Sequence, residues 1–96
     1  AGARAAGMDV VVTDHHNVRA DGVLPAAPIV HPSICGYPCR DLCATAVVYK
    51  LARALLSVAG RDPAEADVDL DLVALATVAD CVPLAGENRR VQFRGE

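Results

Sequence analysis

The chain has 96 residues and a formal net charge of −3; 53% of its residues are hydrophobic and only 3% are aromatic. The acidic balance argues against a free-standing basic nucleic-acid binder, although a basic groove elsewhere in a longer protein is compatible with it. No apolar run approaches the ~20 residues of a membrane span and no signal segment opens the chain, so we expect a cytoplasmic protein without a membrane partner. The core must be built from Ala, Val and Leu.

The first predicted elements are the end of a helix and a strand. Ala1 to Ala6 is alanine-rich, and Gly7 stands where a helix C-terminal glycine belongs. Met8 to Thr13 follows, and its β-branched run Val10 to Val12 is typical of a strand buried on both faces of a parallel sheet. This helix–Gly–strand order predicts an α/β fold. We interpret the chain as an internal piece of a longer protein, because a lone strand would be an exposed edge on both sides.

Three polar residues, Asp14, His15 and His16, follow this strand directly. Ligands of open α/β sheets bind beyond the carboxyl ends of the strands, which makes this the expected place for chemistry. A carboxylate and two imidazoles suit a divalent metal, and imidazole also serves acid–base reactions near neutral pH. Adjacent side chains point in different directions, so we expect different roles for the two histidines. The alternative is a solvated polar loop in which Asp14 caps a turn.

Residues 17–28 are predicted to form a loop with a turn at Asp21-Gly22. Ile29-Val30-His31 is predicted to be a second, very short strand that ends before Pro32. His31 would then face the same crevice as the histidine pair. A hydrogen-bonded structural role is favoured over a ligand role for a single histidine in this position.

The four cysteines are expected to be free thiols. Cys35, Cys39 and Cys43 are spaced by four, which matches none of the common zinc or iron–sulfur patterns. We therefore favour free, mostly buried thiols in a reducing compartment, Cys81 included, over a metal cluster or a disulfide framework.

A long helix is predicted over Leu42 to Ala59, capped by Asp41 and closed by Gly60. Its polar residues form a narrow stripe, which predicts that most of its surface is buried. The stripe consists of Thr45, Lys50, Arg53 and Ser57.

A helix start with Pro at its first position follows at Asp62-Pro63-Ala64-Glu65 and predicts a brief turn. The next helix is predicted over Asp69 to Asp80. Acidic residues at its start suit the positive end of the helix dipole and are interpreted as a solvated cap: Asp67, Asp69 and Asp71. The predicted apolar face consists of Leu72, Val73, Leu75, Ala76 and Val78.

Asp80 lies at the unfavourable end of that helix. Pro83 disfavours helical geometry at Val82, so the helix must stop near Asp80. A carboxylate there faces the negative end of the dipole and loses about 0.3–1 kcal/mol. A nearby cation would reverse that sign, whereas a solvent-exposed Asp80 would pay only a small, screened penalty.

Two motifs carry a resemblance to a known family. They are Val11-Val12-Thr13-Asp14-His15-His16, and Ala76-Thr77-Val78-Ala79-Asp80-Cys81-Val82-Pro83-Leu84 followed by Gly86-Glu87-Asn88-Arg89. With Ile29 to Pro32, Gly36-Tyr37-Pro38 and Leu42 to Leu51, the chain resembles the catalytic core of the DHH phosphoesterase superfamily, specifically the RecJ-type single-strand-specific exonucleases. The family usually has Asn in place of His31, and small glycine positions where this chain has Ala44 and Ala46.

The resemblance implies that residues 1–96 are part of a parallel-sheet DHH core with covering helices, belonging to a phosphodiesterase that uses two divalent ions, Mn²⁺ or Mg²⁺. His15 and Asp80 match metal-binding positions, and His16 matches the contact to the scissile phosphate. Asp14 is expected to orient the pair, and Arg89 to make a structural or phosphate contact. The family's upstream aspartate motifs and downstream DNA-binding domains are absent here, so the 96 residues alone are expected to be inactive.

The implied function is 5′→3′ hydrolysis of single-stranded DNA in repair and recombination, with single-strand-binding protein as an expected partner. The first alternative is another DHH phosphoesterase: an oligoribonuclease, a cyclic-dinucleotide phosphodiesterase or a pyrophosphatase. Those enzymes commonly have Thr after the motif aspartate, whereas Cys81-Val82-Pro83 follows Asp80 here. The second alternative is a non-catalytic DHH-like scaffold, but such proteins tend to lose the ligands that this chain retains.

Overall fold

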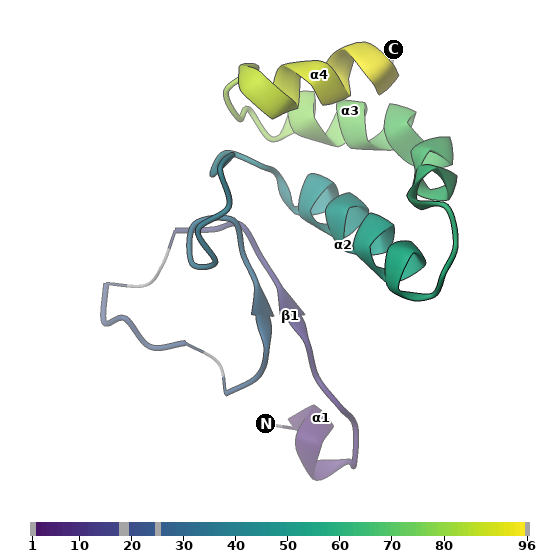
Figure 1. Ribbon diagram of the computed structural model, residues 1–96. Coiled ribbons are helices and arrows are strands. Elements are labelled where there is room, and N and C mark those ends of the chain that lie inside the picture. Colours follow the sequence, from purple (N-terminus) through teal and green to yellow (C-terminus); the bar gives the residue numbers. More distant parts are fainter. Residues whose placement is uncertain (1, 18–19, 25, 96) are drawn as a thin grey trace.

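The computed structural model describes residues 2–17, 20–24 and 26–95, and shows two short strands beside a group of helices (Figure 1). The packed helices follow the strands in the chain, and α4 lies against α3, which in turn lies against α2. The elements, in order, are α1 (Gly2–Ala5), β1 (Val12–Thr13), β2 (Ile29–Val30), α2 (Ala44–Val58), the 3-10 helix η1 (Pro63–Asp69), α3 (Leu70–Ala79) and α4 (Gly86–Gly95).

The two strands form a parallel sheet in which Val12 pairs with Ile29 and Thr13 with Val30. The predictions of a parallel sheet and of a very short second strand are confirmed, but β1 is shorter than Met8 to Thr13. Burial on both faces is wrong for this structure, because Val11 is 58% exposed. A single neighbouring strand leaves one edge of β1 and much of its faces uncovered within the described residues.

The segment between the strands is a loop, as predicted, apart from residues 18, 19 and 25, which lie outside the described residues. At its turn the Asp21 carboxylate accepts the Val23 N–H at 3.0 Å, and Gly22 has a φ of 68°. The helix end at Gly7 is confirmed as well, with Ala1 outside the described residues.

Helix α2 begins later than predicted. Its N-cap is Cys43, which makes no side-chain capping hydrogen bond, so the prediction of an Asp41 cap is wrong. The Asp41 carbonyl instead accepts a hydrogen bond from Asn88. The end at Gly60 is confirmed: Gly60 has a φ of 75°, and the following Arg61 N–H donates to the Leu56 carbonyl at 2.8 Å.

Helix α2 buries only one side, contrary to the prediction that most of its surface is covered. Ala46, Val47 and Tyr49 are buried, whereas Leu55 is 60% and Val58 is 88% exposed. Apolar residues surround much of this helix, but the neighbours that pack against it, chiefly η1 and α3, cover one face.

Helix α3 presents to the core the residues that its 3.6-residue period selects. Leu70, Val73, Ala74 and Thr77 are buried. Of the residues predicted to form the apolar face, Val73 is buried and Ala76 is partly buried. The other three are apolar but lie on other sides of the helix, so they do not reach the core. Leu72, Leu75 and Val78 are exposed.

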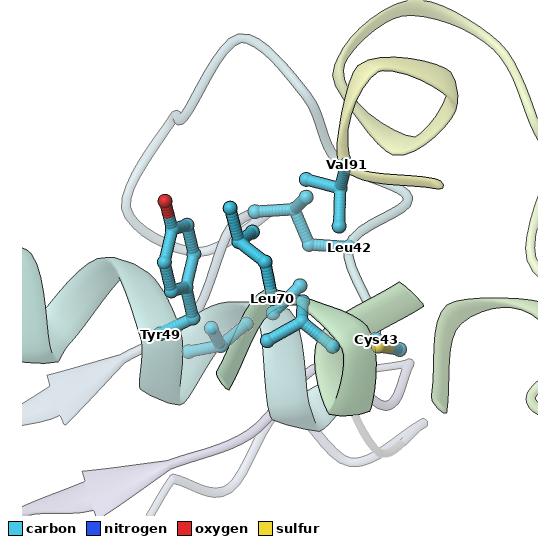
Figure 2. Close-up of a cluster of buried hydrophobic side chains, with 8 residues drawn as sticks. Leu42, Cys43, Tyr49, Leu70 and Val91 are labelled. Atoms are coloured by element: carbon cyan, nitrogen blue, oxygen red, sulfur yellow. The ribbon is translucent and has the colours of Figure 1, made fainter. Parts of the chain in front are cut away.

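The core is one cluster contributed by α2, α3, α4 and the residues just before α2 (Figure 2). Helix α4, which the sequence analysis did not predict, supplies Val91. It lies so close to α3 that a Cβ on Gly95 would fall 2.3 Å from the Leu70 carbonyl oxygen, so only glycine fits there. The cluster consists of Leu42, Cys43, Ala46, Val47, Tyr49, Leu70, Val73 and Val91.

Asp67 joins three helices. The prediction that it belongs to a solvated cap is therefore wrong. Its Oδ1 accepts hydrogen bonds from the Tyr49 hydroxyl at 2.5 Å and the Arg53 guanidinium at 2.9 Å, and its Oδ2 accepts from Arg94 at 2.9 Å. These donors, the Tyr49 hydroxyl first, hold the pKa of Asp67 below its usual value. Asp69 and Asp71 are exposed, as expected.

The start of η1 follows the prediction: Asp62 accepts the Ala64 N–H at 3.0 Å and Pro63 is the first residue of the helix. All four cysteines are free thiols, but only Cys43 is buried, so the expectation of mostly buried thiols is wrong. Among the described residues, no helix has the length and apolar character needed to cross a membrane.

The core assignment predicts unequal effects for two leucines of α3. Leu70 is 6% exposed and Leu75 is 67% exposed. Leu70→Ala should lower the free energy of unfolding by about 2–5 kcal/mol, because it leaves a cavity in the cluster. Leu75→Ala should change it by less than about 0.5 kcal/mol. Urea unfolding followed by circular dichroism measures both, and equal losses would contradict this core.

The Asp67 contacts predict a dependence of stability on acid. A carboxyl group whose pKa is lowered by folding stabilises the fold above its ordinary value of 3.8, and this contribution disappears as the pH falls through the lowered pKa. Asp67→Asn should therefore lower stability at neutral pH and weaken the acid dependence below about pH 4. Tyr49→Phe removes the largest cause of the shift and should move the acid-induced loss to higher pH. Thermal unfolding between pH 2 and 7 tests this, and an unchanged acid profile in both variants would contradict it.

Candidate active site

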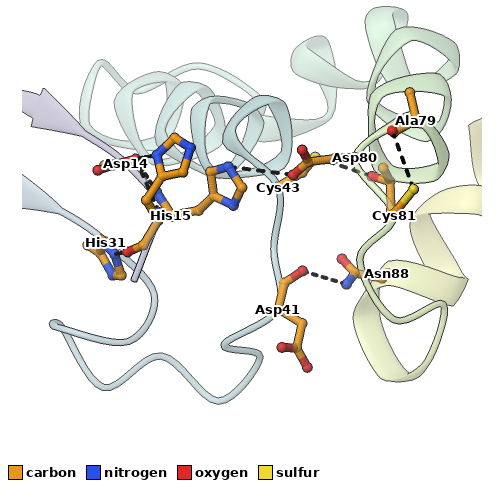
Figure 3. Close-up of polar contacts among 11 residues, drawn as sticks. Asp14, His15, His31, Asp41, Cys43, Ala79, Asp80, Cys81 and Asn88 are labelled. Atoms are coloured by element: carbon orange, nitrogen blue, oxygen red, sulfur yellow. Dashed lines mark hydrogen bonds and ion pairs between the residues drawn. The ribbon is translucent and has the colours of Figure 1, made fainter. Parts of the chain in front are cut away.

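His15 and Asp80 converge although they come from different parts of the fold. His15 follows β1 and Asp80 is the C-cap of α3, and their Nε2 and Oδ2 atoms are 3.5 Å apart (Figure 3). The His15 side chain is 16% exposed and that of Asp80 is 44% exposed. A cation held between these two side chains would offset the unfavourable position of Asp80 at the negative end of α3.

A sharp turn places Asp80 at this position. The Asp80 N–H closes the last turn of α3 on the Ala76 carbonyl at 3.0 Å, and Cys81 then takes a φ of 56°. A left-handed conformation at a residue with a side chain costs about 1–2 kcal/mol relative to glycine. The chain accepts this strain directly beside the carboxylate, a pattern that is common at functional sites.

Asp14 organises the backbone of the histidine pair. Its Oδ1 accepts the His15 N–H at 2.8 Å and the His16 N–H at 3.2 Å, and lies 2.6 Å from His16 Nδ1. These hydrogen bonds, led by the one from the His16 backbone, lower the pKa of Asp14 to about 2. Asp14 is therefore ionised at neutral pH and fixes the turn from which both imidazoles project.

The two histidines have different surroundings, as their adjacency predicted. The His16 side chain is 77% exposed and its Nδ1 faces Asp14, whereas His15 is largely buried and faces Asp80. The two rings lie against each other with centroids 4.6 Å apart. The exposed His16 imidazole is therefore accessible to a ligand.

His31 has the structural role favoured by the sequence. It is 4% exposed; its Nδ1 accepts the N–H groups of Ser33 at 3.1 Å and Ile34 at 3.2 Å. With Nδ1 accepting, the proton resides on Nε2, which donates to the His16 carbonyl at 2.6 Å. His31 thereby ties the loop after β2 to the backbone of the histidine pair.

A cavity of about 300 Å³ opens beside the His15–Asp80 pair. Ala44 and Thr45, the first residues of α2, line it together with Cys43, which makes no side-chain capping bond. The first backbone N–H groups of a helix have no intrahelical acceptor and carry its positive dipole end, an arrangement that suits a phosphate. The cavity thus combines donors for a cation with a favourable environment for an anion.

The donor set fits part of a metal site. His15 Nε2 and Asp80 Oδ2 are 3.5 Å apart and can therefore bind the same ion, because bonds from zinc to histidine nitrogen and carboxylate oxygen are about 2.0–2.2 Å long. Among the described residues, no group of three or more His, Cys, Asp or Glu side chains gathers within reach of one ion. A divalent ion on His15 and Asp80 would need further ligands from water or from other protein groups.

Comparison with curated proteins gives matches along nearly the whole chain. It is 44% identical over 96 residues to the single-stranded-DNA-specific exonuclease RecJ of Bacillus subtilis, an alignment that covers 97% of this chain and 11% of that protein. It is 38% identical over 106 residues to the RecJ of Escherichia coli, an alignment that covers 97% of this chain and 18% of that protein. It is 37% identical over 99 residues to the RecJ of Haemophilus influenzae, with coverage of 93% of this chain and 17% of that protein. The chain is related to the RecJ family.

The chain spans less than a fifth of the length of these RecJ relatives. No family model and no solved structure matches it. The RecJ relationship therefore rests on sequence, and the geometry of the site rests on the structure described above.

Arg89, matched to a position of the RecJ pattern, lies on the exposed side of α4. Its guanidinium is 5.7 Å from the centre of the Phe93 ring. The contact identified for it is thus with its own helix, and a phosphate contact by Arg89 stays a prediction.

Sequence reasoning missed the role of Asn88 in this RecJ-related segment. Asn88 is fully buried, and its Nδ2 donates to the carbonyls of Asp41 at 2.8 Å and Pro83 at 3.0 Å. It thus joins the segment leading into α2 to the turn that follows Asp80. Its place in the Gly86-Glu87-Asn88-Arg89 motif was a signal, but only the tertiary structure identifies the two acceptors.

The His31 hydrogen bonds predict a measurable tautomer and a conservative rescue. His31→Ala should destabilise the fold by about 1–3 kcal/mol, because it removes the three hydrogen bonds that a buried imidazole makes. His31→Asn should recover part of this loss, since an Asn side chain can accept N–H groups two residues on. The ¹⁵N chemical shifts of His31 should show a proton on Nε2 and none on Nδ1 at neutral pH. The opposite tautomer would contradict the assigned network.

Proposed function

We propose that the protein containing this chain is a metal-dependent phosphodiesterase that degrades single-stranded DNA in the 5′→3′ direction during repair and recombination. The observation that carries the proposal is the convergence of His15 and Asp80, 3.5 Å apart, on a cavity that the N-terminus of α2 also lines. The relationship to exonucleases named for single-stranded DNA supplies the substrate class.

The reaction needs the attacking and leaving oxygens and the phosphoryl charge to be stabilised together, which two divalent ions, Mn²⁺ or Mg²⁺, supply when bound. His15 and Asp80 would hold one of them. His16 lies on the solvent side of the pair, where its imidazole can contact the scissile phosphate. Asp14 Oδ1 can accept a hydrogen bond from Nδ1 of His16, which leaves Nε2 as the ring nitrogen available to the phosphate. The dipole of α2 favours the phosphate in the same cavity.

The rest of the site would come from parts of the protein outside this chain. Two donors do not make an ion cage, so we propose that an upstream aspartate motif of the DHH superfamily completes it. Residues 1–96 are then a partial DHH catalytic domain, and other domains of a cytoplasmic enzyme provide the main groove for DNA and the contact with single-strand-binding protein. The chain alone should lack turnover.

The alternatives have less support. The matched relatives are RecJ exonucleases. Cys81-Val82-Pro83 follows Asp80 in this chain, whereas an oligoribonuclease, a cyclic-dinucleotide phosphodiesterase or a pyrophosphatase commonly has Thr after that aspartate. A non-catalytic scaffold would not need the strained turn at Cys81 that holds Asp80 beside His15.

Substitutions in the full-length protein test the site. His15→Ala and Asp80→Asn should each abolish most hydrolysis of end-labelled single-stranded DNA and weaken Mn²⁺ binding in calorimetry, because each removes a metal donor. His16→Ala should keep Mn²⁺ affinity and lose about 10²–10³ in rate, the usual effect of removing one preorganised electrostatic contact. Asp71→Asn is the matched control, since Asp71 is an exposed acid at the other end of α3.

Wild-type turnover in His15→Ala would refute the proposed function. The 96-residue chain, assayed in parallel with Mn²⁺, should show no digestion. Digestion by this chain that disappears with His15→Ala would show that the missing ligands are not needed.

A further inference from the structure

A second cavity, of about 200 Å³, lies between α2 and α4 and gathers much of the positive charge of the chain. Four of the nine Lys and Arg residues line it: Lys50, Arg53, Arg90 and Arg94. Arg90 and Arg94 are one turn apart on α4, and Lys50 and Arg53 are neighbours on α2, so two basic stripes face one another. Such a concentration is unexpected in a chain with a net charge of −3.

The carboxylates at this cavity are too few to neutralise it. Glu87 lines the cavity and forms an ion pair with Lys50. Asp67, adjacent to it, is shared between Arg53 and Arg94. Among the described residues, the interaction identified for Arg90 is electrostatic attraction to Glu87, which Lys50 already engages. Four cations thus face two anions, and the cavity carries an excess of positive charge.

The excess charge is accessible to a ligand. The Arg94 side chain is 60% exposed and that of Lys50 is 38% exposed. Arg90 is exposed as well, and no ion pair is identified for it among the described residues, so an incoming anion can bind its guanidinium without breaking one. Guanidinium groups offer paired N–H donors that match the oxygens of a phosphate.

The cavity is suited to a phosphate and not to a base. Tyr49, the aromatic residue that lines it, is 8% exposed and its hydroxyl is held by Asp67, so its ring offers no free stacking face. Recognition here would therefore be independent of sequence, as expected of contacts to a nucleic-acid backbone.

The cavity is separate from the one at His15 and Asp80. Thr45 lines that first cavity and Arg53 lines this one. They are eight residues apart on α2, about 12 Å along the helix axis. We propose that the basic cavity binds a second backbone phosphate of a single-stranded nucleic acid, away from the phosphate at His16. This inference rests on the proposed function for the identity of the strand, but not for the existence of the anion site.

Arg90→Gln in the full-length protein is the test, because Arg90 is exposed and lies outside the Asp67 contacts that stabilise the fold. Fluorescence anisotropy with a labelled oligothymidylate in EDTA measures binding without hydrolysis. We expect roughly tenfold weaker binding and a salt slope smaller by ~0.7. The affinity of Arg90→Lys should lie between those of the wild type and Arg90→Gln, since lysine keeps the charge but lacks the paired N–H donors of a guanidinium. Arg61→Gln, an exposed arginine paired with Glu65, is the matched control and should bind like the wild type.

Each outcome decides the inference. Wild-type affinity and salt slope in Arg90→Gln would overturn it, as would an equal loss in Arg61→Gln. A further measurement is the inhibition of oligothymidylate binding by inorganic phosphate, compared with chloride at equal ionic strength. If Arg90→Gln loses this inhibition but keeps wild-type DNA affinity, the cavity binds free phosphate and the backbone proposal fails. Failure of the proposed function is read separately, from DNA hydrolysis that survives His15→Ala.

Discussion

The packing of α3 against α2 is the constraint on which the rest of the structure depends. Val73 and Leu70 of α3 join Ala46 and Val47 of α2 in one buried cluster. The chain returns along α2 after η1, so the end of α3 lies beside the beginning of α2, as the residues lining the first cavity show (Figure 1). Loss of this packing would separate Asp80 from His15 without altering either residue.

Two opposite charges meet at that end of the helix pair. The start of α2 carries a partial positive charge and the end of α3, at Asp80, a partial negative one. A site made this way can hold a cation on the carboxylate side and an anion on the N–H side, which are the two species present when a metal ion binds a phosphodiester. Asp14 and His31 contribute indirectly, because their hydrogen bonds fix the backbone from which His15 and His16 project.

The other side of the helix group is organised by ion pairs. Asp67 joins α2, η1 and α4, and Glu87 joins α4 to Lys50 of α2. These contacts explain why α4 was not predicted: its sequence has little apolar periodicity, and its position is set by charged partners far away in the chain and by the close approach of Gly95 to α3. They also leave the surplus of arginines from which the second phosphate site is inferred.

The sequence by itself determined the features that depend on neighbours within a few residues. Glycines ended helices at Gly7 and Gly60, Asp62 capped η1, and Pro83 stopped the helix that carries Asp80. The polar triplet after β1 likewise indicated where the candidate site lies. Only the tertiary structure decided which faces of α2 and α3 are buried, what Asp67 and Asn88 bind, and that His15 meets Asp80. The physical reason is that capping and turn geometry are local, whereas burial and ion pairing depend on which distant segment packs alongside.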